Sequence, residues 1–408
     1  MTGFLKLTKA KKQILVLYTS SLLGVAMGIL NSVLNTRALP PVEYGDYRYI
    51  QNIIDFVTSL LLFGYFTSGS RLLALSKSEN YARSLRGAMC FILAIAIGIL
   101  MLVLLILGFI NLLPSNNNLF FYAIPVCGYA LMLNYINTVG QGDNHIGRIS
   151  IARILPPGLY CISAFFIFKY SGASSSKMLL LYDGIGVITY LAIIASTKPS
   201  FSNLKQSLSE LAKENKQYGF NVYLGSIIAV STQYLAGITL GHFCPDNSNV
   251  GFYTLSATMA APLSMLPMII GTTFFKKFAS QNRIDRKVLG TSFILTLGSC
   301  LLFIFLIKYV VSFLYNENYS SVGHYAAFLA IATSMTGLGD LFNRFLGAHG
   351  QGKSIRNGAI ACGIMTIIGN ILFVYIWGIN GAVLTRILSA LIYLSVMILS
   401  YRSYSSKH

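Results

Sequence analysis

Residues 87–110 read GAMCFILAIAIGILMLVLLILGFI and contain no charged side chain. The uncharged stretch continues to residue 142, which is far too long for one helix, and it divides at the turn-forming residues 111–118, NLLPSNNN. A transmembrane helix needs about 20 apolar residues. The stretch therefore predicts two membrane-spanning helices joined by a short turn.

The composition extends this prediction to the whole chain. Of the 408 residues, 55% are hydrophobic and only 10% are charged, whereas about a quarter of a soluble domain is charged. A soluble domain, a disordered chain, a collagen and a disulfide scaffold are all excluded. The six cysteines are scattered without a CxxC pair, and no P-loop, HExxH or GxSxG motif occurs. We therefore expect no metal site, no cofactor and no catalytic residues, and a protein that is not an enzyme.

Ten further stretches have the length and hydropathy of spans, which predicts an all-α polytopic membrane protein with about twelve transmembrane helices. Four of these stretches tolerate one ionisable residue each, namely Asp55, Arg153, Asp183 and Arg386. The ten stretches are residues 14–36, 49–70, 149–168, 178–197, 217–245, 247–275, 288–307, 318–339, 357–378 and 379–401.

The distribution of basic residues orients these spans. With the N-terminus inside, 24 of the 30 Lys and Arg residues fall in cytoplasmic segments, five fall in outer segments, and Arg386 lies within a span. This bias agrees with the positive-inside rule and predicts that both termini are cytoplasmic. The net charge of +18 therefore reflects topology and attraction to membrane lipids, so we expect no nucleic-acid partner.

The chain shows a weak internal repeat. The segment Tyr44–Tyr47 (YGDY) follows the first span and Val250–Tyr253 (VGFY) follows the seventh, and a Gly-Gln-Gly sequence follows both the fourth and the tenth. Six spans per copy give both copies the same orientation, which is a parallel repeat typical of transporters. We expect an N-lobe at residues 1–198 with helices 1–6, a cytoplasmic loop at 199–217, and a C-lobe at 218–408 with helices 7–12.

The segment RALPPVEYGDY at residues 37–47 resembles the signature of polysaccharide-repeat-unit flippases, the Wzx group of the MOP (multidrug/oligosaccharidyl-lipid/polysaccharide) exporter superfamily. Gly140–Gly142, Gly350–Gly352 and residues 378–385 (GINGAVLT) are similar to inter-helix turns of that family. The resemblance covers nearly the whole chain, although its motifs are short. The related lipid II flippases carry two extra helices, for which this chain has no room.

The resemblance implies a MATE-like fold of two six-helix lobes around a central cavity. It also implies an activity: moving an undecaprenyl-pyrophosphate-linked oligosaccharide, such as an O-antigen repeat unit of lipopolysaccharide, between leaflets of the bacterial inner membrane. Transport would proceed by alternating access. A polymerase and a chain-length regulator of the same pathway would be partners.

Ionisable side chains inside the bilayer are costly and mark candidate sites. An arginine can donate two hydrogen bonds to one phosphate group, so we expect the pyrophosphate to meet arginines. The candidates for binding the pyrophosphate and glycan are, in order, Arg386, Arg71, Arg344, Arg37 and Arg48. The alternatives are an ion pair of Arg386 with Asp55 or Asp183, snorkelling of Arg71 and Arg344, and loop salt bridges of Arg37 and Arg48.

Asp55, Asp183 and Asp340 are candidates for binding a coupling H⁺ or Na⁺, and structural pairing is the alternative for all three. Asp340 and Arg344 have the i,i+4 spacing that allows them to pair on one helix face. The prolines in the spans, Pro125, Pro262, Pro267 and the Pro156-Pro157 pair, predict kinks or helix breaks.

The tyrosines fall into two groups. An aromatic belt at the outer interface accounts for Tyr44, Tyr47, Tyr49, Tyr315 and Tyr319. Deeper tyrosines, among them Tyr182, Tyr190 and Tyr234, would stack on sugar rings or simply pack between helices, and packing is the preferred interpretation.

Two other functions are compatible with a dozen spans. A multidrug/cation antiporter would share the fold, but the segment at residues 37–47 argues against it. An O-antigen-type polymerase usually carries a large outer loop, and the outer loops predicted here are short.

Overall fold

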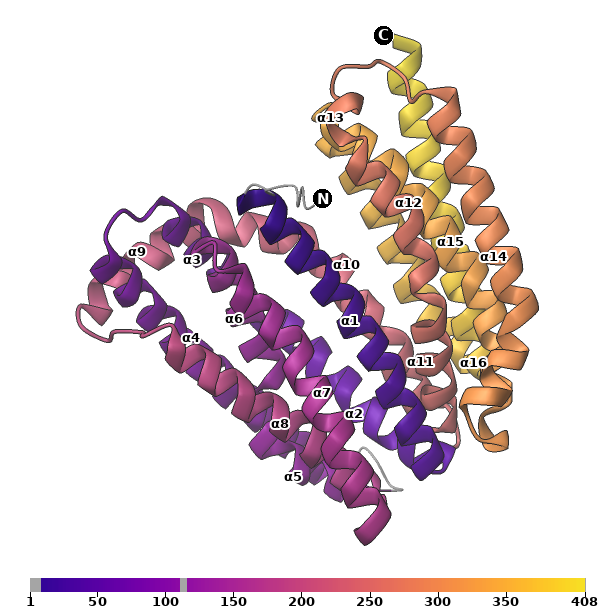
Figure 1. The fold of residues 1–408 in the computed structure, drawn as a ribbon, viewed down its shortest axis with the longest axis horizontal. Helices are drawn as coiled ribbons and strands as arrows, with labels where there is room; N and C mark the ends of the chain where they lie inside the picture. The colour runs from indigo at the N-terminus through magenta and orange to yellow at the C-terminus, as the bar shows by residue number, and fades with distance from the viewer. Residues whose placement is uncertain (1–8, 111–115, 408) are drawn as a thin grey trace, which may run out of the picture. The chain divides into compact units, whose positions relative to one another are not determined.

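The computed structural model describes residues 9–110 and 116–407, and helix is the regular secondary structure throughout these ranges (Figure 1). Residues 111–115 of the predicted turn lie outside the described residues. The α-helices are α1 Lys9–Ala38, α2 Pro41–Leu61, α3 Tyr65–Leu75, α4 Glu79–Ile110, α5 Asn118–Ala123, α6 Tyr129–Gly142, α7 Ile146–Ser171, α8 Ser175–Ser196, α9 Leu204–Glu214, α10 Phe220–Phe243, α11 Ser248–Ala260, α12 Pro262–Thr273, α13 Phe275–Phe278, α14 Arg286–Leu314, α15 Ser321–Ala348 and α16 Gly352–Lys407. Two 3₁₀ turns, η1 Ile124–Val126 and η3 Glu317–Tyr319, and a π turn, η2 Asn215–Gly219, complete the set.

The helices account for the predicted spans. Within the described residues, eight helical segments are long and apolar enough to cross a membrane, and the bent pair α2–α3 makes a ninth. One of the eight, α16, contains two spans separated by the non-helical Gly378, and α1 and α10 also have the length to cross. The fold is therefore an all-α polytopic membrane fold of about twelve transmembrane helices.

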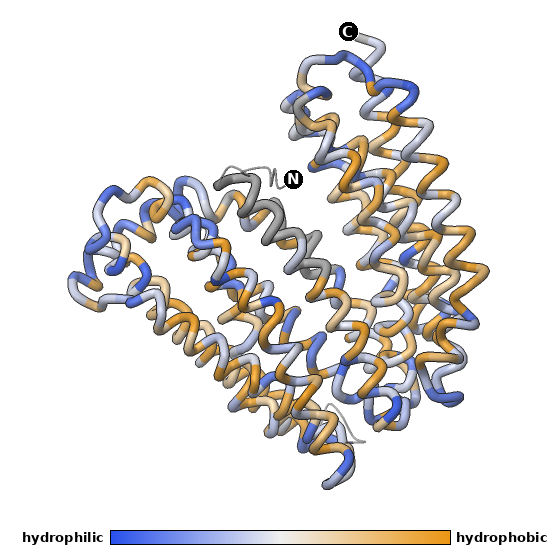
Figure 2. Tube along the Cα trace, viewed as in Figure 1, coloured by the Kyte–Doolittle hydropathy of each residue, from blue (hydrophilic) through white to orange (hydrophobic). Residues whose placement is uncertain are grey.

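Lipid-facing surfaces support this assignment. The longest apolar helices expose large hydrophobic side chains, including Phe109 at 76% and Phe305 at 70%. Figure 2 shows apolar residues along most of α4 and α14, and polar residues at the α9 end of the first compact unit and the α13 end of the second. Exposed apolar surface of this extent needs a lipid environment.

The chain divides into two compact units. Unit 1 comprises Met1–Leu39 and Ile53–Ile227, and unit 2 comprises Pro40–Asn52 and Ile228–His408. We expected lobes at residues 1–198 and 218–408, and two segments differ. The first half of α2 is grouped with unit 2, and residues 199–227, including the start of α10, are grouped with unit 1.

The two repeat motifs pack against each other inside unit 2. A Cβ on Gly45 of α2 would lie 1.7 Å from the carbonyl oxygen of Asn247, and one on Gly251 of α11 would lie 3.3 Å from the carbonyl oxygen of Pro41. Asn247 Nδ2 donates a 2.7 Å hydrogen bond to Asp46 Oδ1, and both side chains are buried. The glycines therefore permit a close approach of the first half of α2 to the start of α11.

The tyrosines of the signature segment belong to this contact. Tyr44, Tyr47 and Tyr49 are each at most 1% exposed, and Tyr315 and Tyr319 are also buried. The ring of Tyr319 lies edge-on to the rings of Tyr44 and Phe252, at 6.2 and 6.1 Å. The expectation of an aromatic belt at these positions is wrong, because the rings fill the interior of unit 2.

The helix breaks differ from the proline-based expectation. The predicted single span at residues 49–70 bends by 58° between α2 and α3, where Phe63 and Gly64 have positive φ angles of 43° and 80°. In contrast, α7 continues through Pro156 and Pro157. A break at that pair is therefore wrong. Asn31 Nδ2 of the neighbouring α1 donates a 3.2 Å hydrogen bond to the Pro157 carbonyl, which ties α1 to α7 at the proline pair.

The other prolines lie where a helix tolerates them. Pro262 is the first residue of α12, separated from the end of α11 by Ala261, and Pro267 lies inside α12. Pro125 lies in the 3₁₀ turn η1 between α5 and α6. Spans 4 and 8 are therefore interrupted at Pro125 and Pro262.

The predicted loop at residues 199–217 contains a helix. In α9, Leu211 is fully buried, and its remaining side chains are mostly polar. Figure 1 shows α9 beside the first turns of α4 in unit 1. The π turn η2 then connects α9 directly to α10.

Candidate functional site

A polar cavity of about 430 Å³ lies within unit 2. Its walls come from the first half of α2, from α10 and α11, and from both halves of α16. The lining residues are Asn52, Gln233, Tyr234, Ala236, Gly237, Tyr253, Thr254, Ala257, Thr258, Ala261, Thr366, Asn370, Ala382, Thr385 and Arg386. Most of these carry hydroxyl or amide groups, although they lie in membrane-spanning helices.

Arg386 provides the charge of this cavity. It is partly buried, and within the described residues its guanidinium forms no hydrogen bond or ion pair. Asn370 is 2% exposed; its Nδ2 donates to the Thr366 carbonyl at 2.9 Å, while its Oδ1 is buried without a partner. A buried acceptor and an unpaired arginine in one polar cavity are groups that a polar, anionic ligand could satisfy.

The backbone of α16 places these side chains. Gly378 adopts φ 53° and ψ −130°, where the helix is interrupted. The two halves of α16, before and after Gly378, pack tightly against each other, since a Cβ on Gly369 would lie 2.6 Å from the Thr385 side chain. Thr366 Oγ1 also donates to Ser389 Oγ at 3.0 Å. The small residues thus bring Asn370 and Arg386 to one cavity.

Unit 1 contains its own cavity, of about 330 Å³. Its arginine is Arg153 of α7. The lining residues are Gly24, Val25, Gly28, Tyr129, Leu133, Ala152, Arg153, Pro156, Pro157, Tyr182, Gly186 and Tyr190. Tyr182 and Tyr190 here, and Tyr234 in unit 2, line cavities, so helix packing alone does not describe these deeper tyrosines.

Two predicted arginines are held by neighbouring side chains. Arg71 of α3 forms a 2.5 Å ion pair with Glu214 and lies over the Tyr218 ring at 4.9 Å, and its side chain is half exposed. Arg48 of α2 donates 2.9 Å hydrogen bonds to Tyr44 and Gln51. These contacts give both side chains a structural role.

The other two lie at helix ends. Arg37 is exposed in the last turn of α1 in unit 1. Arg344 is exposed near the end of α15 in unit 2, with its alkyl chain against Gly271. Neither lines the cavity that contains Arg386.

The predicted acidic residues have hydrogen-bond partners or are fully buried. Asp55 accepts a 3.1 Å hydrogen bond from Tyr129, which lines the unit 1 cavity. Asp183 of α8 is fully buried. Asp340 accepts a 2.8 Å hydrogen bond from Tyr393, and the expected pairing with Arg344 does not form among the described side chains. Of the eight predicted residues, Arg386 lines the cavity of unit 2, while Asp55 contacts the lining of the other cavity.

Sequence reasoning missed a buried ion pair at one end of unit 1. Arg86 Nε of α4 lies 2.9 Å from Asp143 Oδ2, and both side chains are about 95% buried. Arg86 also donates to the Thr197 carbonyl at 2.9 Å and pairs with Glu79 at 2.8 Å. This cluster joins the ends of α4, α6 and α8. The only sequence signal was an aspartate directly after a Gly-Gln-Gly turn in a basic segment.

Sequence reasoning also missed Asn370, whose amide has no unusual sequence context.

A comparison with protein families shows what the chain is related to. Residues 10–280 match a family described as polysaccharide biosynthesis protein. The chain belongs to this family. None of the curated proteins matches the sequence.

The fold of this polysaccharide biosynthesis family member is similar to that of solved transporters. A lipid II flippase MurJ in an inward closed conformation superposes with a TM-score of 0.74 at 13% identity, covering 95% of this chain and 87% of that one. An inward-facing multidrug resistance MATE transporter of the MOP superfamily gives 0.64 at 14% identity over 94% and 96%. A eukaryotic MATE transporter gives 0.56 at 11% identity over 96% and 98%.

These similarities establish the MOP-type fold and the family. The fold expectation is confirmed, as is membership of a polysaccharide biosynthesis family. At 11–14% identity the solved structures carry no information about the substrate.

Proposed function

We propose that this protein is a flippase for an undecaprenyl-pyrophosphate-linked oligosaccharide in the bacterial inner membrane. The proposal rests on the position of Arg386, which lines the polar cavity of unit 2. An unpaired guanidinium in a membrane-spanning helix costs at least ~2.5–3.5 kcal/mol on insertion scales, and here it lines a polar cavity and forms no ion pair with the described side chains. A family of polysaccharide biosynthesis proteins makes a lipid-linked glycan the natural anionic cargo.

The chemistry of the cavity suits such a cargo. The guanidinium would donate paired hydrogen bonds to a phosphate. The neutral hydroxyl and amide groups, such as Asn370, Thr254 and Gln233, would exchange hydrogen bonds with sugar hydroxyls or water. The polyprenyl tail would stay in lipid, since the cavity offers few apolar side chains.

The remaining candidates have subordinate roles in the proposal. Arg344, exposed and unpaired among the described residues, is a secondary contact for the pyrophosphate, and Arg37 is a weaker one. Arg71 and Arg48 already have partners and are proposed as structural. Asp55, Asp183 and Asp340 remain candidates for a coupling H⁺ or Na⁺ in an alternating-access cycle.

The proposal includes the surroundings of the protein. Both termini would be cytoplasmic, and a polymerase and chain-length regulator would receive the exported repeat units. The protein would act without a metal or cofactor and would perform no covalent chemistry.

The test is deletion of the gene in its host followed by complementation. We expect the deletion to abolish surface polysaccharide and to accumulate complete lipid-linked repeat units inside. Arg386→Ala should lower export roughly 10- to 100-fold, the effect of losing a charged hydrogen bond, at unchanged protein level. Arg386→Lys should rescue part of it. Arg402→Ala, an exposed arginine near the end of the same helix, should behave as wild type.

Two results would contradict the proposal. Single repeat units that reach the surface without chain growth would identify a polymerase. An unchanged surface with altered drug sensitivity would identify a multidrug antiporter on the same fold.

A further inference from the structure

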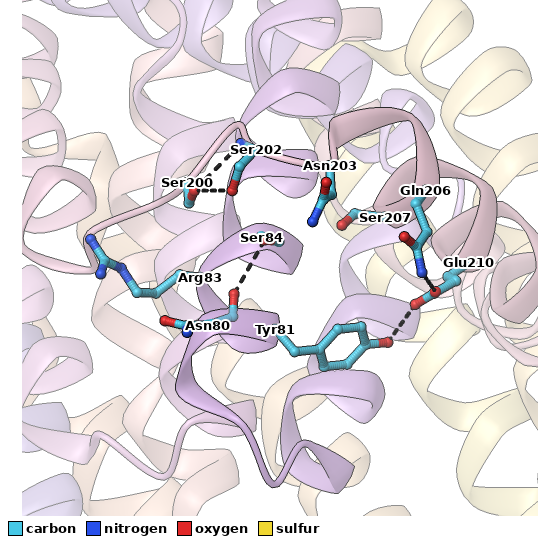
Figure 3. A pocket seen from close by; sticks show the side chains of 10 residues that line it. All are labelled: Asn80, Tyr81, Arg83, Ser84, Ser200, Ser202, Asn203, Gln206, Ser207 and Glu210. Carbon is cyan, nitrogen blue, oxygen red and sulfur yellow. Dashed lines mark hydrogen bonds between the residues drawn. The ribbon is translucent and has the colours of Figure 1, made fainter.

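A second polar pocket, of about 460 Å³, lies in unit 1 between the first turns of α4 and the segment that leads into α9 (Figure 3). We name it the α4–α9 pocket. All ten lining residues are polar: Asn80, Tyr81, Arg83, Ser84, Ser200, Ser202, Asn203, Gln206, Ser207 and Glu210. It shares no residue with either cavity described above.

Hydrogen bonds within the pocket orient some of its polar side chains and leave other polar groups available to a ligand. The Glu210 carboxylate accepts hydrogen bonds from Tyr81 Oη at 2.7 Å and from Gln206 Nε2 at 3.0 Å. Ser207 is only 3% exposed, and its hydroxyl forms no hydrogen bond within the described residues although it lines the hollow (Figure 3). The Ser207 oxygen is not among the enclosed polar atoms that lack a partner, so it opens onto the pocket and is available to a ligand or water.

Backbone contacts hold the two walls together. Ser200 N donates to the Arg83 carbonyl at 2.8 Å, and Arg83 Nε donates to the Lys198 carbonyl at 3.0 Å. A Cβ on Gly87 would lie 2.0 Å from the Ser200 carbonyl oxygen, so this glycine permits the close approach. The fully buried Leu211 anchors α9 on the same side. The pocket is therefore preformed and does not require a loop to close.

We infer that the α4–α9 pocket binds a neutral sugar ring. The single arginine and the single glutamate in the lining cancel in charge, and the carboxylate would repel a phosphate. No aliphatic side chain lines the pocket, which excludes an acyl or prenyl chain. Hydroxyl, amide and carboxylate groups match the mixed donors and acceptors of a sugar, and Tyr81 supplies an apolar ring face.

The inference deepens the proposed function and rests on it for the source of the sugar. Four lysines lie in residues 198–216, and the positive-inside rule places such a segment in the cytoplasm. The pocket would then hold a sugar of the lipid-linked oligosaccharide before it crosses the membrane. Sugar binding to the α4–α9 pocket is measured without transport, so the sugar-binding inference and the proposed flippase function are tested separately.

The experiment is saturation-transfer NMR on the purified full-length protein in detergent. The probes are the methyl glycosides of glucose, galactose, mannose and N-acetylglucosamine, with glycerol as a polyol that lacks a ring. The variants are Glu210→Gln and Ser207→Ala. Ser209→Ala is the matched control, because Ser209 lies on the same helix but is exposed and does not line the pocket.

We expect at least one glycoside to give transfer above glycerol in wild type and in Ser209→Ala. Glu210→Gln should weaken that binding about tenfold, through loss of a charged acceptor, and Ser207→Ala should weaken it measurably. The inference is overturned if no glycoside exceeds glycerol, if both pocket variants bind like wild type, or if inorganic phosphate displaces the glycoside. A wild-type protein that exports normally but binds no glycoside would overturn the inference alone, whereas a wild-type protein that binds a glycoside but has no export activity would overturn only the proposed function.

Discussion

At the scale of the residue, the signature segment at residues 37–47 is a packing motif. Gly45 lies where any side chain would collide with the backbone of Asn247, and its neighbours Tyr44, Asp46 and Tyr47 are buried. A resemblance in this segment therefore reports the fold of unit 2, and contact with cargo is not required to explain it.

Gly45→Ala is expected to destabilise the protein by roughly 1–3 kcal/mol, the usual effect of overpacking. In an ordinary helix the same change stabilises by up to about 1 kcal/mol. Gly298→Ala in α14 is the control, because a Cβ there meets nothing within 4 Å. Thermal unfolding of the purified protein measures both. A Gly45→Ala variant that melts at or above wild type would contradict the close approach.

Arg386 could be identified from sequence because a lone charge deep in an apolar run is visible without any contact information. Asn370, Ser207 and Glu210 could not, since an amide, a hydroxyl or a surface carboxylate is ordinary until its neighbours are known.

At the scale of the element, the ends of α4, α6 and α8 are joined by the buried pair Arg86–Asp143. Asp143→Ala is expected to cost about 3–5 kcal/mol, because it removes the buried counter-charge of Arg86 and leaves only the exposed Glu79 carboxylate. The double variant Arg86→Met, Asp143→Leu should recover much of this loss. Arg148→Ala should cost less than about 1 kcal/mol, since that side chain is more exposed and 3.8 Å from Asp143.

Thermal unfolding of wild type, Arg86→Met, Asp143→Leu and the double variant forms a double-mutant cycle, and Asp143→Ala and Arg148→Ala are measured beside it. Strict additivity of the Arg86 and Asp143 changes would show that the pair does not act as a unit.

Helix positions were predictable and helix breaks were not. Lipid requires long uncharged runs, so the spans are visible in composition alone. The bend at Phe63 depends on residues about 150 positions later: Asn215 Nδ2 donates to the Phe63 carbonyl, and Tyr223 Oη donates to the Leu60 carbonyl. The uninterrupted α7 packs against α1, which contacts the proline pair through Asn31. Such tertiary contacts override local preference and leave no local pattern.

At the scale of the molecule, the two compact units do not coincide with the two sequence repeats, because Pro40–Asn52 belongs with unit 2. A fragment of residues 203–408 lacks this segment. Asn247 would lose Asp46, and Tyr319 would lose the Tyr44 ring. We expect this fragment alone to be degraded, and co-expression with residues 1–202 to restore a stable protein.

The matched control is co-expression with a 1–202 fragment that carries Gly45→Ala, which should restore less. Cellular abundance and gel filtration measure the outcome. A fragment of residues 203–408 that accumulates alone as a monodisperse species would show that Pro40–Asn52 is dispensable for its core.

Pro40–Asn52 is synthesised long before the rest of unit 2, which begins at Ile228. Asp46 is synthesised 201 residues before its partner Asn247. At a translation rate of about 5–20 residues per second, that separation lasts roughly 10–40 s. Throughout this interval the residues of α10, α11 and η3 that later pack against Gly45, Asp46 and the tyrosines of this segment do not yet exist. We therefore expect the insertion machinery or lipid headgroups to contact this half of α2 until more than half of the protein has been made.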